Sequence, residues 1–518
     1  MVKETDITAS LAAMAETGQD SRHVELFAGP ALPPDEAPAG EEAPIDKSEV
    51  VLEASASSRD ADLKTKSAED VARESVSDKI EIAAPVEPIP KLVPSILYCV
   101  PACLLDITSG AALSQRTLMI ALAQRGFRTV ALQATIFDSP KGGEHVIKAG
   151  EAHKDKPILR ANTHGVAHII LRTKATARRE MTCAEQELYL QLFRQEIRQR
   201  RPDMIFIWGG MLLEMTMMRE AREAGIPVIF YLVNGSYKNK ETFRYVSTVV
   251  TDTRATAELY RDRLGLECKV VGKFIDPGLV KPKVPRRPDF LTFINPSFEK
   301  GVSVFMPLAK LAAEEAPEIR FLVVQARGRW GNALRVLKYR PEDFPNVKVI
   351  DHRLDMRPVY ASTRALLLPS LWHESGARVI AEAQINGIPV LASKTGGSAE
   401  MIGTGGVLFE VPEVFREKKT VPVPEEVVRS WLAEIKRVWH DAAYYENLCR
   451  KAENEAGKHD IAKSTDRFLR AVSPAVLASK GINLAVTSGM GARIGSTTPK
   501  KASKRSAKGR RQTKRSKS

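Results

Sequence analysis

Strand-like apolar runs alternate with helix-like amphipathic runs along the sequence, in two successive series. The first series predicts strands at 95–100, 129–133, 167–171, 204–208 and 228–233, and helices at 113–125, 183–200 and 212–224. Helices placed between strands in this way cross over a sheet and return the chain in the same direction. The first series therefore predicts a parallel sheet with helices on both faces, over residues 94–280.

A proline-rich stretch at 281–288 interrupts the pattern, because proline continues neither a helix nor a central strand. The second series then predicts strands at 290–294, 320–325, 347–350, 365–369 and 389–392, and helices at 302–316, 356–362, 377–386, 424–456 and 461–472. The predicted fold class is α/β, with two doubly wound Rossmann-like domains, 94–280 and 281–474. Ligands of such sheets bind beyond the carboxyl ends of the strands, so the two domains are expected to face each other across a cleft.

The two ends of the chain have a different composition. Residues 1–93 are rich in Ala, Glu, Pro and Ser and contain the single aromatic Phe27, which predicts a disordered acidic region. Residues 475–518 predict a disordered basic tail that ends in a Lys- and Arg-rich run. Such a tail predicts weak contact with nucleic acid or an anionic membrane, or else a solvated tail with no single partner.

The compartment is predicted from what the sequence does not contain. It has no apolar run long enough to span a membrane and no signal-peptide core at its start. The expected location is the cytoplasm, with the inner face of a membrane as a site of peripheral contact. The oligomeric state is left open by the sequence.

The stretch that predicts chemistry follows the strand at 365–369. The helix after it is expected to begin with the amides of Ser375, Gly376 and Ala377, and a glycine there lets a ligand approach the backbone. A helix N-terminus offers free N–H groups and a partial positive charge, which suit a phosphate. Glu374 stands at the mouth of this helix and Glu382 lies further along it. Each carboxylate is expected to contact one end of a nucleotide-linked ligand.

A glycine turn at Gly396 and Gly397 is expected to bring more backbone to the same strand ends. Two glutamates on a helix also occur as a solvated helix face without function. The buried strand before this helix and the Gly-Ile-Pro-Val stretch after it favour the functional interpretation.

Residues 369–400 resemble the donor site of family 4 retaining glycosyltransferases with the GT-B fold. That pattern is a strand, Glu-x7-Glu on a helix, Gly-x-Pro-Val, and then Gly-Gly-x-x-Glu; the likeness extends more weakly over 94–470. It implies a nucleotide-sugar donor as substrate, no cofactor and no metal. The acceptor is implied to be a glycan, a lipid-linked or another hydroxyl compound. Lys300 is implied to contact the donor diphosphate and Glu374 the donor sugar, as the catalytic pair.

The resemblance also places residues outside that segment. In the first domain, Ser109, Gly110 and Ala111 match the small-residue loop on the acceptor side. The family usually has arginine where this chain has Asn295, and Arg327 or Arg329 is expected to supply the missing charge.

A second departure concerns the acceptor side, where Asn234 stands in place of a common histidine, and His164 and His168 lie elsewhere in the sequence. Three hypotheses follow. The first is an active glycosyltransferase. The second is a catalytically retired GT-B protein that binds nucleotide-sugars or serves as a scaffold. The third is a protein that associates with nucleic acid through its basic tail.

Overall fold

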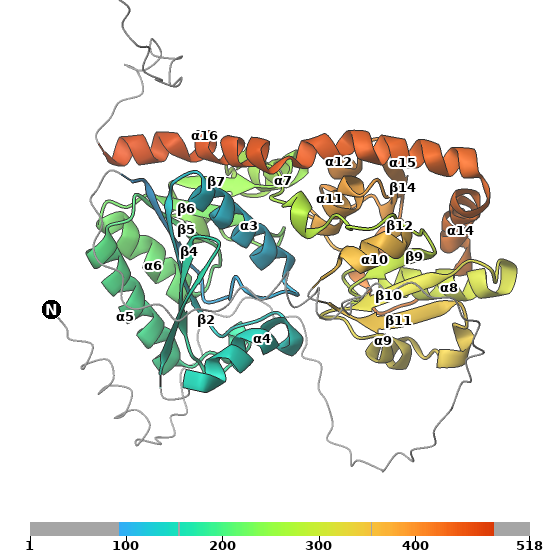
Figure 1. The fold of residues 1–518 in the computed structure, drawn as a ribbon, viewed down its shortest axis with the longest axis horizontal. Helices are drawn as coiled ribbons and strands as arrows, with labels where there is room; N and C mark the ends of the chain where they lie inside the picture. The colour runs from blue at the N-terminus through green and yellow to red at the C-terminus, as the bar shows by residue number, and fades with distance from the viewer. Residues whose placement is uncertain (1–92, 154–155, 354, 481–518) are drawn as a thin grey trace, which may run out of the picture.

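The computed structural model describes residues 93–153, 156–353 and 355–480. Nearly all of the predicted acidic region (1–93) and most of the predicted basic tail (475–518) lie outside the described residues. The described chain forms two α/β units side by side, with helices α15 (Ala442–Ala456) and α16 (Ile461–Ser479) following one another along both (Figure 1). The two predicted series of strands and helices correspond to these two units.

The first unit is built on an eight-stranded sheet of order β3-β4-β2-β1-β5-β6-β7-β8. All neighbouring strands are parallel except β3 and β4, which form an antiparallel hairpin. The strands are β1 (Ser95–Cys99), β2 (Arg128–Ala134), β3 (Ile158–Thr163), β4 (Val166–Leu171), β5 (Met204–Ile207), β6 (Val228–Leu232), β7 (Thr248–Thr251) and β8 (Cys268–Val270). The sequence-based prediction omitted β3, β7 and β8, which lie toward the two edges of the sheet.

Helices cover both faces of this sheet. Helices α5 and α6 pack against each other on one face, and α3 packs on the other face with α16 (Figure 1). A capping box at Thr182 and Glu185 fixes the start of α5. The helices are α3 (Gly110–Gln124), α4 (Pro140–Gly150), α5 (Cys183–Arg200), α6 (Leu212–Glu223) and α7 (Arg254–Leu264).

The second unit has a six-stranded sheet of order β11-β10-β9-β12-β13-β14, parallel throughout. Its strands are β9 (Phe290–Ile294), β10 (Phe321–Gln325), β11 (Val347–Asp351), β12 (Thr363–Leu368), β13 (Val390–Ser393) and β14 (Gly406–Phe409). Its helices are α8 (Val302–Glu315), α9 (Trp330–Leu337), α10 (Arg357–Ser362), α11 (Arg378–Ile385), α12 (Ser398–Ile402), α13 (Glu413–Glu417), α14 (Glu425–His440) and α15 (Ala442–Ala456). The single helix predicted at 424–456 is divided at Asp441, whose side chain caps α15.

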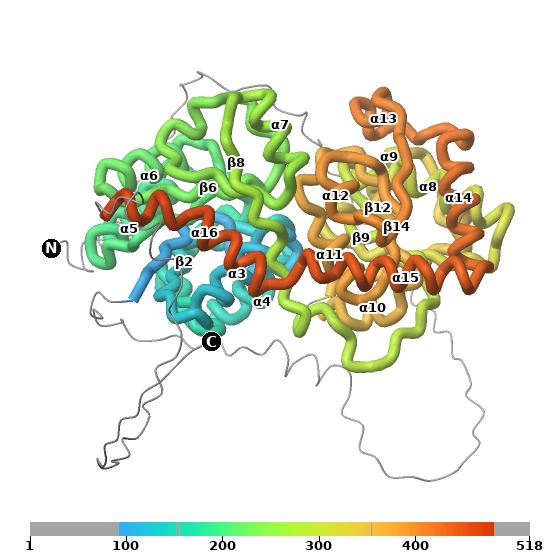
Figure 2. Tube along the Cα trace, turned by 90° about the horizontal axis from the view of Figure 1, so that it is seen from above, coloured from blue at the N-terminus to red at the C-terminus, as the bar shows by residue number. Residues whose placement is uncertain are grey.

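The last helix, α16 (Ile461–Ser479), returns the chain from the second unit to the first. Figure 2 shows α15 and α16 following one another along both units. Phe468 and Val472 are buried in the core of the first unit, and the Phe468 ring packs edge-on against Phe206 and Phe274. The predicted boundary at 474 was wrong in two respects. Residues 475–479 are helical, and the helix packs on the first domain because its apolar face covers that sheet.

The proline-rich linker at 281–288 contains no helix or strand, as predicted. Arg286 attaches it to the second unit by donating hydrogen bonds to the carbonyl oxygens of Asn386 and Thr363, at 2.8 Å each. Within the part of the chain that the structure describes, no helix has the length and apolar character needed to cross a membrane.

Candidate active site

A cavity of about 330 Å³ lies between the two units, at the carboxyl ends of strands from both sheets. The first unit contributes the loop after β1, helix α3 and the β3–β4 turn. The second unit contributes the loop after β9, helix α10 and helix α11. The cleft predicted from the two series of strands and helices is therefore present. Of the predicted site residues, Gly110, Lys300, Ala377 and Glu382 line it.

Lys300 reaches the cavity from the tight loop between β9 and α8. Gly301 closes this loop with a φ of 82°, and a Cβ atom there would lie 1.7 Å from the carbonyl oxygen of Pro369. The Lys300 ammonium donates to a carboxylate oxygen of Glu374 at 2.6 Å, and the Ser370 hydroxyl donates to the same oxygen at 2.7 Å. The buried Glu374 carboxylate thus holds a cation at the cavity wall.

The loop at 373–377 differs from its prediction. Helix α11 begins at Arg378 with Ala377 as its N-cap, so the amides of Ser375, Gly376 and Ala377 precede the helix. The Ser375 carbonyl accepts a hydrogen bond from the Thr253 hydroxyl of the first unit at 2.7 Å. In a helix that started at Ser375, this carbonyl would instead accept a hydrogen bond from a backbone amide of the same helix. The helix predicted at 377–386 is observed within one residue of each end, but Ser375 and Gly376 lie in the loop before it and their amides are not its first amides.

Glu382 is on α11 and buried at the cavity wall. Its carboxylate forms an ion pair with Arg378, one turn earlier, at 2.5 Å. It also accepts a hydrogen bond from the hydroxyl of Tyr360. Burial is the main cause, and the negative charge of Glu382 the second, that raises the pKa of Tyr360 well above its usual value. The carboxylate is thus held in one orientation.

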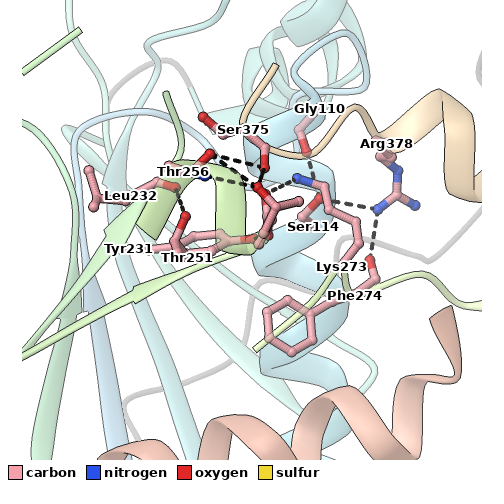
Figure 3. A network of polar contacts seen from close by, with 12 residues as sticks. Gly110, Ser114, Tyr231, Leu232, Thr251, Thr256, Lys273, Phe274, Ser375 and Arg378 are labelled. Carbon is pink, nitrogen blue, oxygen red and sulfur yellow. Dashed lines mark hydrogen bonds and ion pairs between the residues drawn. The ribbon is translucent and has the colours of Figure 1, made fainter. Parts of the chain in front are cut away.

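Figure 3 shows the contacts that join the two units beside this loop. The hydroxyls of Thr253 and Thr256 both donate to the Ser375 carbonyl, and the Arg378 guanidinium donates to the Phe274 carbonyl at 2.9 Å. Beneath them Lys273 and Asp252 form a buried ion pair at 2.7 Å.

The Asp252 side chain fills the space over Gly376, where an added Cβ would lie 2.5 Å from its Cβ. Asp252 also accepts a hydrogen bond from the Tyr231 hydroxyl. The loop of the second unit is thus shaped by polar groups of the first, and a side chain at position 376 would displace them.

Residues 288–418 match the family described as Glycosyl transferases group 1. The matched segment contains Lys300, Glu374 and Glu382, so the second domain is similar to this family. No curated protein matches the sequence.

Solved structures show which fold the chain has. Sucrose-phosphate synthase of Thermosynechococcus elongatus is 14% identical with a TM-score of 0.56, over 75% of this chain and all of that one. A Rickettsia africae glycosyltransferase is 12% identical with a TM-score of 0.55, over 74% of this chain and 99% of that one. Anabaena HepE, solved with UDP and glucose, is 15% identical with a TM-score of 0.52, over 73% of this chain and 99% of that one. The chain has the GT-B fold of these proteins.

The glycine pair, Gly396 and Gly397, lies behind Glu374 and does not line the cavity. Gly396 has a φ of 51°, and an added Cβ would lie 2.5 Å from the Glu374 carbonyl oxygen. The Gly397 amide donates to that same oxygen at 2.6 Å. The two glycines therefore fix the backbone of Glu374, which is a different placement from the ligand contact that the sequence suggested.

The first-domain loop lies across the cavity from Lys300. The Ser109 hydroxyl caps α3 by accepting from the amide of Ala112, and Gly110 lines the cavity. Ala111 follows in the first turn of α3 and does not line the cavity. The Ser114 hydroxyl donates to the Gly110 carbonyl at 2.8 Å (Figure 3), which fixes the loop on its helix.

The expected substitute for the family arginine is not at the cavity. Arg327 is exposed and lies outside the lining, and Arg329 forms an ion pair with Asp351 at 3.0 Å. Asn295 does line the cavity, with a left-handed φ of 66°, and its side-chain oxygen accepts from the Gly328 amide at 2.7 Å. The Asn295 side chain therefore joins the loops that follow β9 and β10. These loops lie so close that an added Cβ on Gly328 would be 2.3 Å from the backbone nitrogen of Ser297.

The unpredicted cavity residues of the first domain include three with basic side chains: Arg116 on α3, His145 on α4 and His164 in the β3–β4 turn. His164 and Gly165 both have positive φ, 50° and 82°, as a two-residue hairpin turn requires. The sequence signal for this turn was the His-Gly pair between two strands. The sequence placed His164 only negatively, as a histidine away from Asn234, the position at which the family commonly has histidine.

Proposed function

We propose that the chain transfers a sugar from a nucleotide-sugar donor to a hydroxyl group of an acceptor, with retention of configuration. The observation that carries the proposal is the Lys300–Glu374 pair, because it holds a cation against the cavity next to a backbone loop. A cation fixed in this way stabilises negative charge without reorganising when the charge develops. Charge develops on the diphosphate as the sugar leaves it.

The donor diphosphate is assigned to Lys300 and the amides of Ser375–Ala377. The hydroxyls of Ser375 and Thr395 are buried here without a hydrogen-bond partner among the described residues. Buried hydroxyls normally have partners, so these two suit a ligand with acceptor oxygens. In this assignment Glu374 orients the donor sugar.

The ribose is assigned to Glu382. A carboxylate accepts hydrogen bonds from both hydroxyls of a ribose, since it has two oxygens and no donor. Tyr360 and Arg378 hold the Glu382 carboxylate in place before a ligand arrives, so little conformational entropy remains to be lost on binding.

In the proposed reaction the acceptor hydroxyl attacks the anomeric carbon from the side on which the diphosphate leaves. The bond from that carbon to the diphosphate oxygen breaks, the bond to the acceptor oxygen forms, and the acceptor proton passes to the departing diphosphate oxygen. The diphosphate itself is the base, so the reaction uses no side chain as base. Closure of the two domains excludes water that would otherwise compete with the acceptor.

The first experiment measures donor binding by the full chain. A thermal-shift screen with UDP-, GDP- and ADP-sugars selects the base, since a ligand of the folded state raises the melting temperature. Titration calorimetry then compares the chain with Glu382→Ala, for which affinity is expected to fall about 10- to 100-fold, the worth of charged hydrogen bonds. The control is Glu426→Ala, an exposed glutamate on α14. Equal affinity of all three proteins would disprove the assignment of Glu382.

A catalytically retired protein that only binds nucleotide-sugars is the second candidate. The observation in its favour is Asn295, which occupies the place of the family arginine and uses its side chain to hold the Gly328 loop. An assay for release of nucleoside diphosphate, with and without a panel of sugar acceptors, separates the two candidates. Donor binding with no release under any condition would favour the retired protein.

A further inference from the structure

One short segment of the first domain, residues 253–256 at the start of α7, lies against the 373–377 loop of the second domain. The Thr253 hydroxyl donates to the Ser375 carbonyl at 2.7 Å. The Thr256 hydroxyl donates to the same oxygen over a longer distance, 3.4 Å (Figure 3). Both threonine side chains are buried, so these hydrogen bonds are shielded from water. The first domain thus fixes the position of a carbonyl in the second.

The same segment of the first domain also receives a side chain from the second. Glu400 accepts hydrogen bonds from the amides of Arg254 and Ala255, at 2.7 and 3.2 Å. These amides belong to the first turn of α7, where the helix leaves N–H groups free and favours a negative charge. Gly397 leaves room for Thr253, because an added Cβ would lie 2.6 Å from the Thr253 hydroxyl oxygen. The two domains therefore exchange hydrogen bonds in both directions across one small contact.

The loop held by this contact has polar groups that protein atoms do not use. Among the described residues, the amides of Ser375, Gly376 and Ala377 donate no hydrogen bond, and the buried Ser375 hydroxyl has no partner. Buried N–H and O–H groups are normally paired, and a diphosphate has the acceptor oxygens that these groups need.

The Thr253 hydrogen bond also sets the direction of one of these amides. The Ser375 carbonyl and the Gly376 amide belong to one planar trans peptide, so they point in opposite directions. Fixing the carbonyl toward Thr253 therefore aims the Gly376 amide away from the first-domain contact. Rotation of this peptide would turn the amide and would break the Thr253 bond at the same time.

We propose that Thr253 is a positioning residue for the donor: from the first domain, its hydroxyl holds the 375–377 loop in the shape that binds the donor diphosphate. The inference rests on the proposed function, because it concerns the diphosphate loop of the same site. A loop fixed in advance loses little conformational entropy on binding, whereas a loop released from Thr253 must be ordered by the ligand. Donor affinity and the contact between the domains are then coupled, since each favours the same loop shape.

The test is calorimetric titration of the full chain with UDP, GDP and ADP, of which the tightest becomes the probe for every variant. Thr253→Val is expected to lower its affinity about five- to ten-fold, the worth of one buried hydrogen bond. The affinity for the matching nucleoside, measured by competition, is expected to stay within about two-fold, because a nucleoside has no phosphate. Thr253→Ser retains the hydroxyl and is expected to restore the diphosphate affinity.

The Thr253 hydroxyl also caps α7 by accepting from the Thr256 amide, so the loss of a cap needs its own control. Thr182→Val removes the same kind of cap from α5 of the same domain, and the Thr182 hydrogen bonds stay within the first turn of that helix. It is expected to leave both affinities unchanged. Thr256→Val retains the Thr253 bond and should weaken the diphosphate only about two-fold.

Failure of this inference is distinct from failure of the proposed function. If none of the three nucleoside diphosphates binds the unmodified chain, the proposed function fails. If one of them binds and Thr253→Val binds it equally well, Thr253 does not position the loop. If Thr253→Val weakens the nucleoside as much as the diphosphate, or Thr182→Val has the same effect as Thr253→Val, the role of Thr253 is purely structural and the inference is wrong.

Discussion

The second-domain wall of the cavity takes its residues from consecutive parts of one sheet, and each of its cations is matched by a carboxylate: the pairs are Lys300–Glu374, Arg357–Asp355 and Arg378–Glu382. The first-domain wall takes Arg116, His145 and His164 from three separate elements, without a carboxylate among its described lining residues. The paired charges of the second-domain wall, or matched wall, hold its side chains in place, so it can bind a ligand with little rearrangement. The difference teaches that one wall is built within a single domain segment, whereas the other depends on elements that only folding brings together.

The buried Asp252–Lys273 pair supports the contact between the walls, and breaking it should have the largest effect. Both side chains are under 10% exposed. Asp252→Ala leaves the Lys273 charge without its partner and is expected to lower the free energy of unfolding by about 3–5 kcal/mol. Urea unfolding near neutral pH measures the change, with the exposed Asp262→Ala as control. A loss no greater than that of the control would show that the pair is not needed for stability.

Removal of Lys300 tests whether the matched wall performs the chemistry. Lys300→Ala is expected to lower turnover by about 10²–10³-fold, since one fixed group that stabilises transition-state charge is worth that much. The measurement is initial rate at saturating donor, with the exposed Lys348→Ala as control. Turnover within a few-fold of the unmodified protein would remove Lys300 from the reaction.

Two histidines of the first domain, His145 and His164, line the cavity, whereas His168 is buried in the core of the domain. His168 is buried between Gln133 and Thr163, and its pKa is lowered to about 3, mainly by burial. A lowered histidine pKa means that the folded state binds fewer protons than the unfolded state below pH 6.5. Stability is therefore complete above that pH and decreases as the pH falls.

The expected loss from His168 between pH 7 and pH 5 is roughly 2 kcal/mol. Denaturant unfolding of the unmodified chain and of His168→Gln, each at both pH values, isolates the contribution of His168. His459, with a pKa lowered to about 4, contributes equally to both proteins and cancels in the comparison. An identical pH dependence in the two proteins would contradict the role given to His168.

The smallest expected effect is that of metal removal. In the proposed mechanism Lys300 and loop amides stabilise the diphosphate, so EDTA is expected to change the rate by less than about two-fold. Loss of activity in EDTA that Mg²⁺ restores would show that the matched wall is incomplete without a cation.

Part of the second-domain wall could be predicted because its information is local. The glycines and the two glutamates lie within 369–400, directly after a strand, and their spacing is enough to place them on adjoining loops and one helix. The amides of Ser375 and Gly376 were wrongly assigned to the start of α11, because the Ser375 carbonyl is instead held by Thr253, more than one hundred residues away. No local pattern contains that contact.

Apart from Gly110, the first-domain wall was not predicted, because its residues come together only after folding. Strand β3 alternates buried and partly exposed residues at the sheet edge, so it lacks the apolar run of a central strand. Without β3 there is no hairpin, and without the hairpin His164 has no reason to lie near Arg116. The helix at 461–472 was predicted, but its packing partner was not, since an apolar helix face does not specify which sheet it covers.

Helix α16 has a consequence for the time course of synthesis. Phe468 and Val472 complete the core of a domain whose other elements end near residue 280. At about 5–20 residues per second, ribosomes need on the order of 10–40 seconds to make the intervening chain. Throughout that interval the nascent first domain exposes the apolar surface around Phe206 and Phe274. A chaperone that binds emerging chains is expected to remain on this domain until the final helix has left the ribosome.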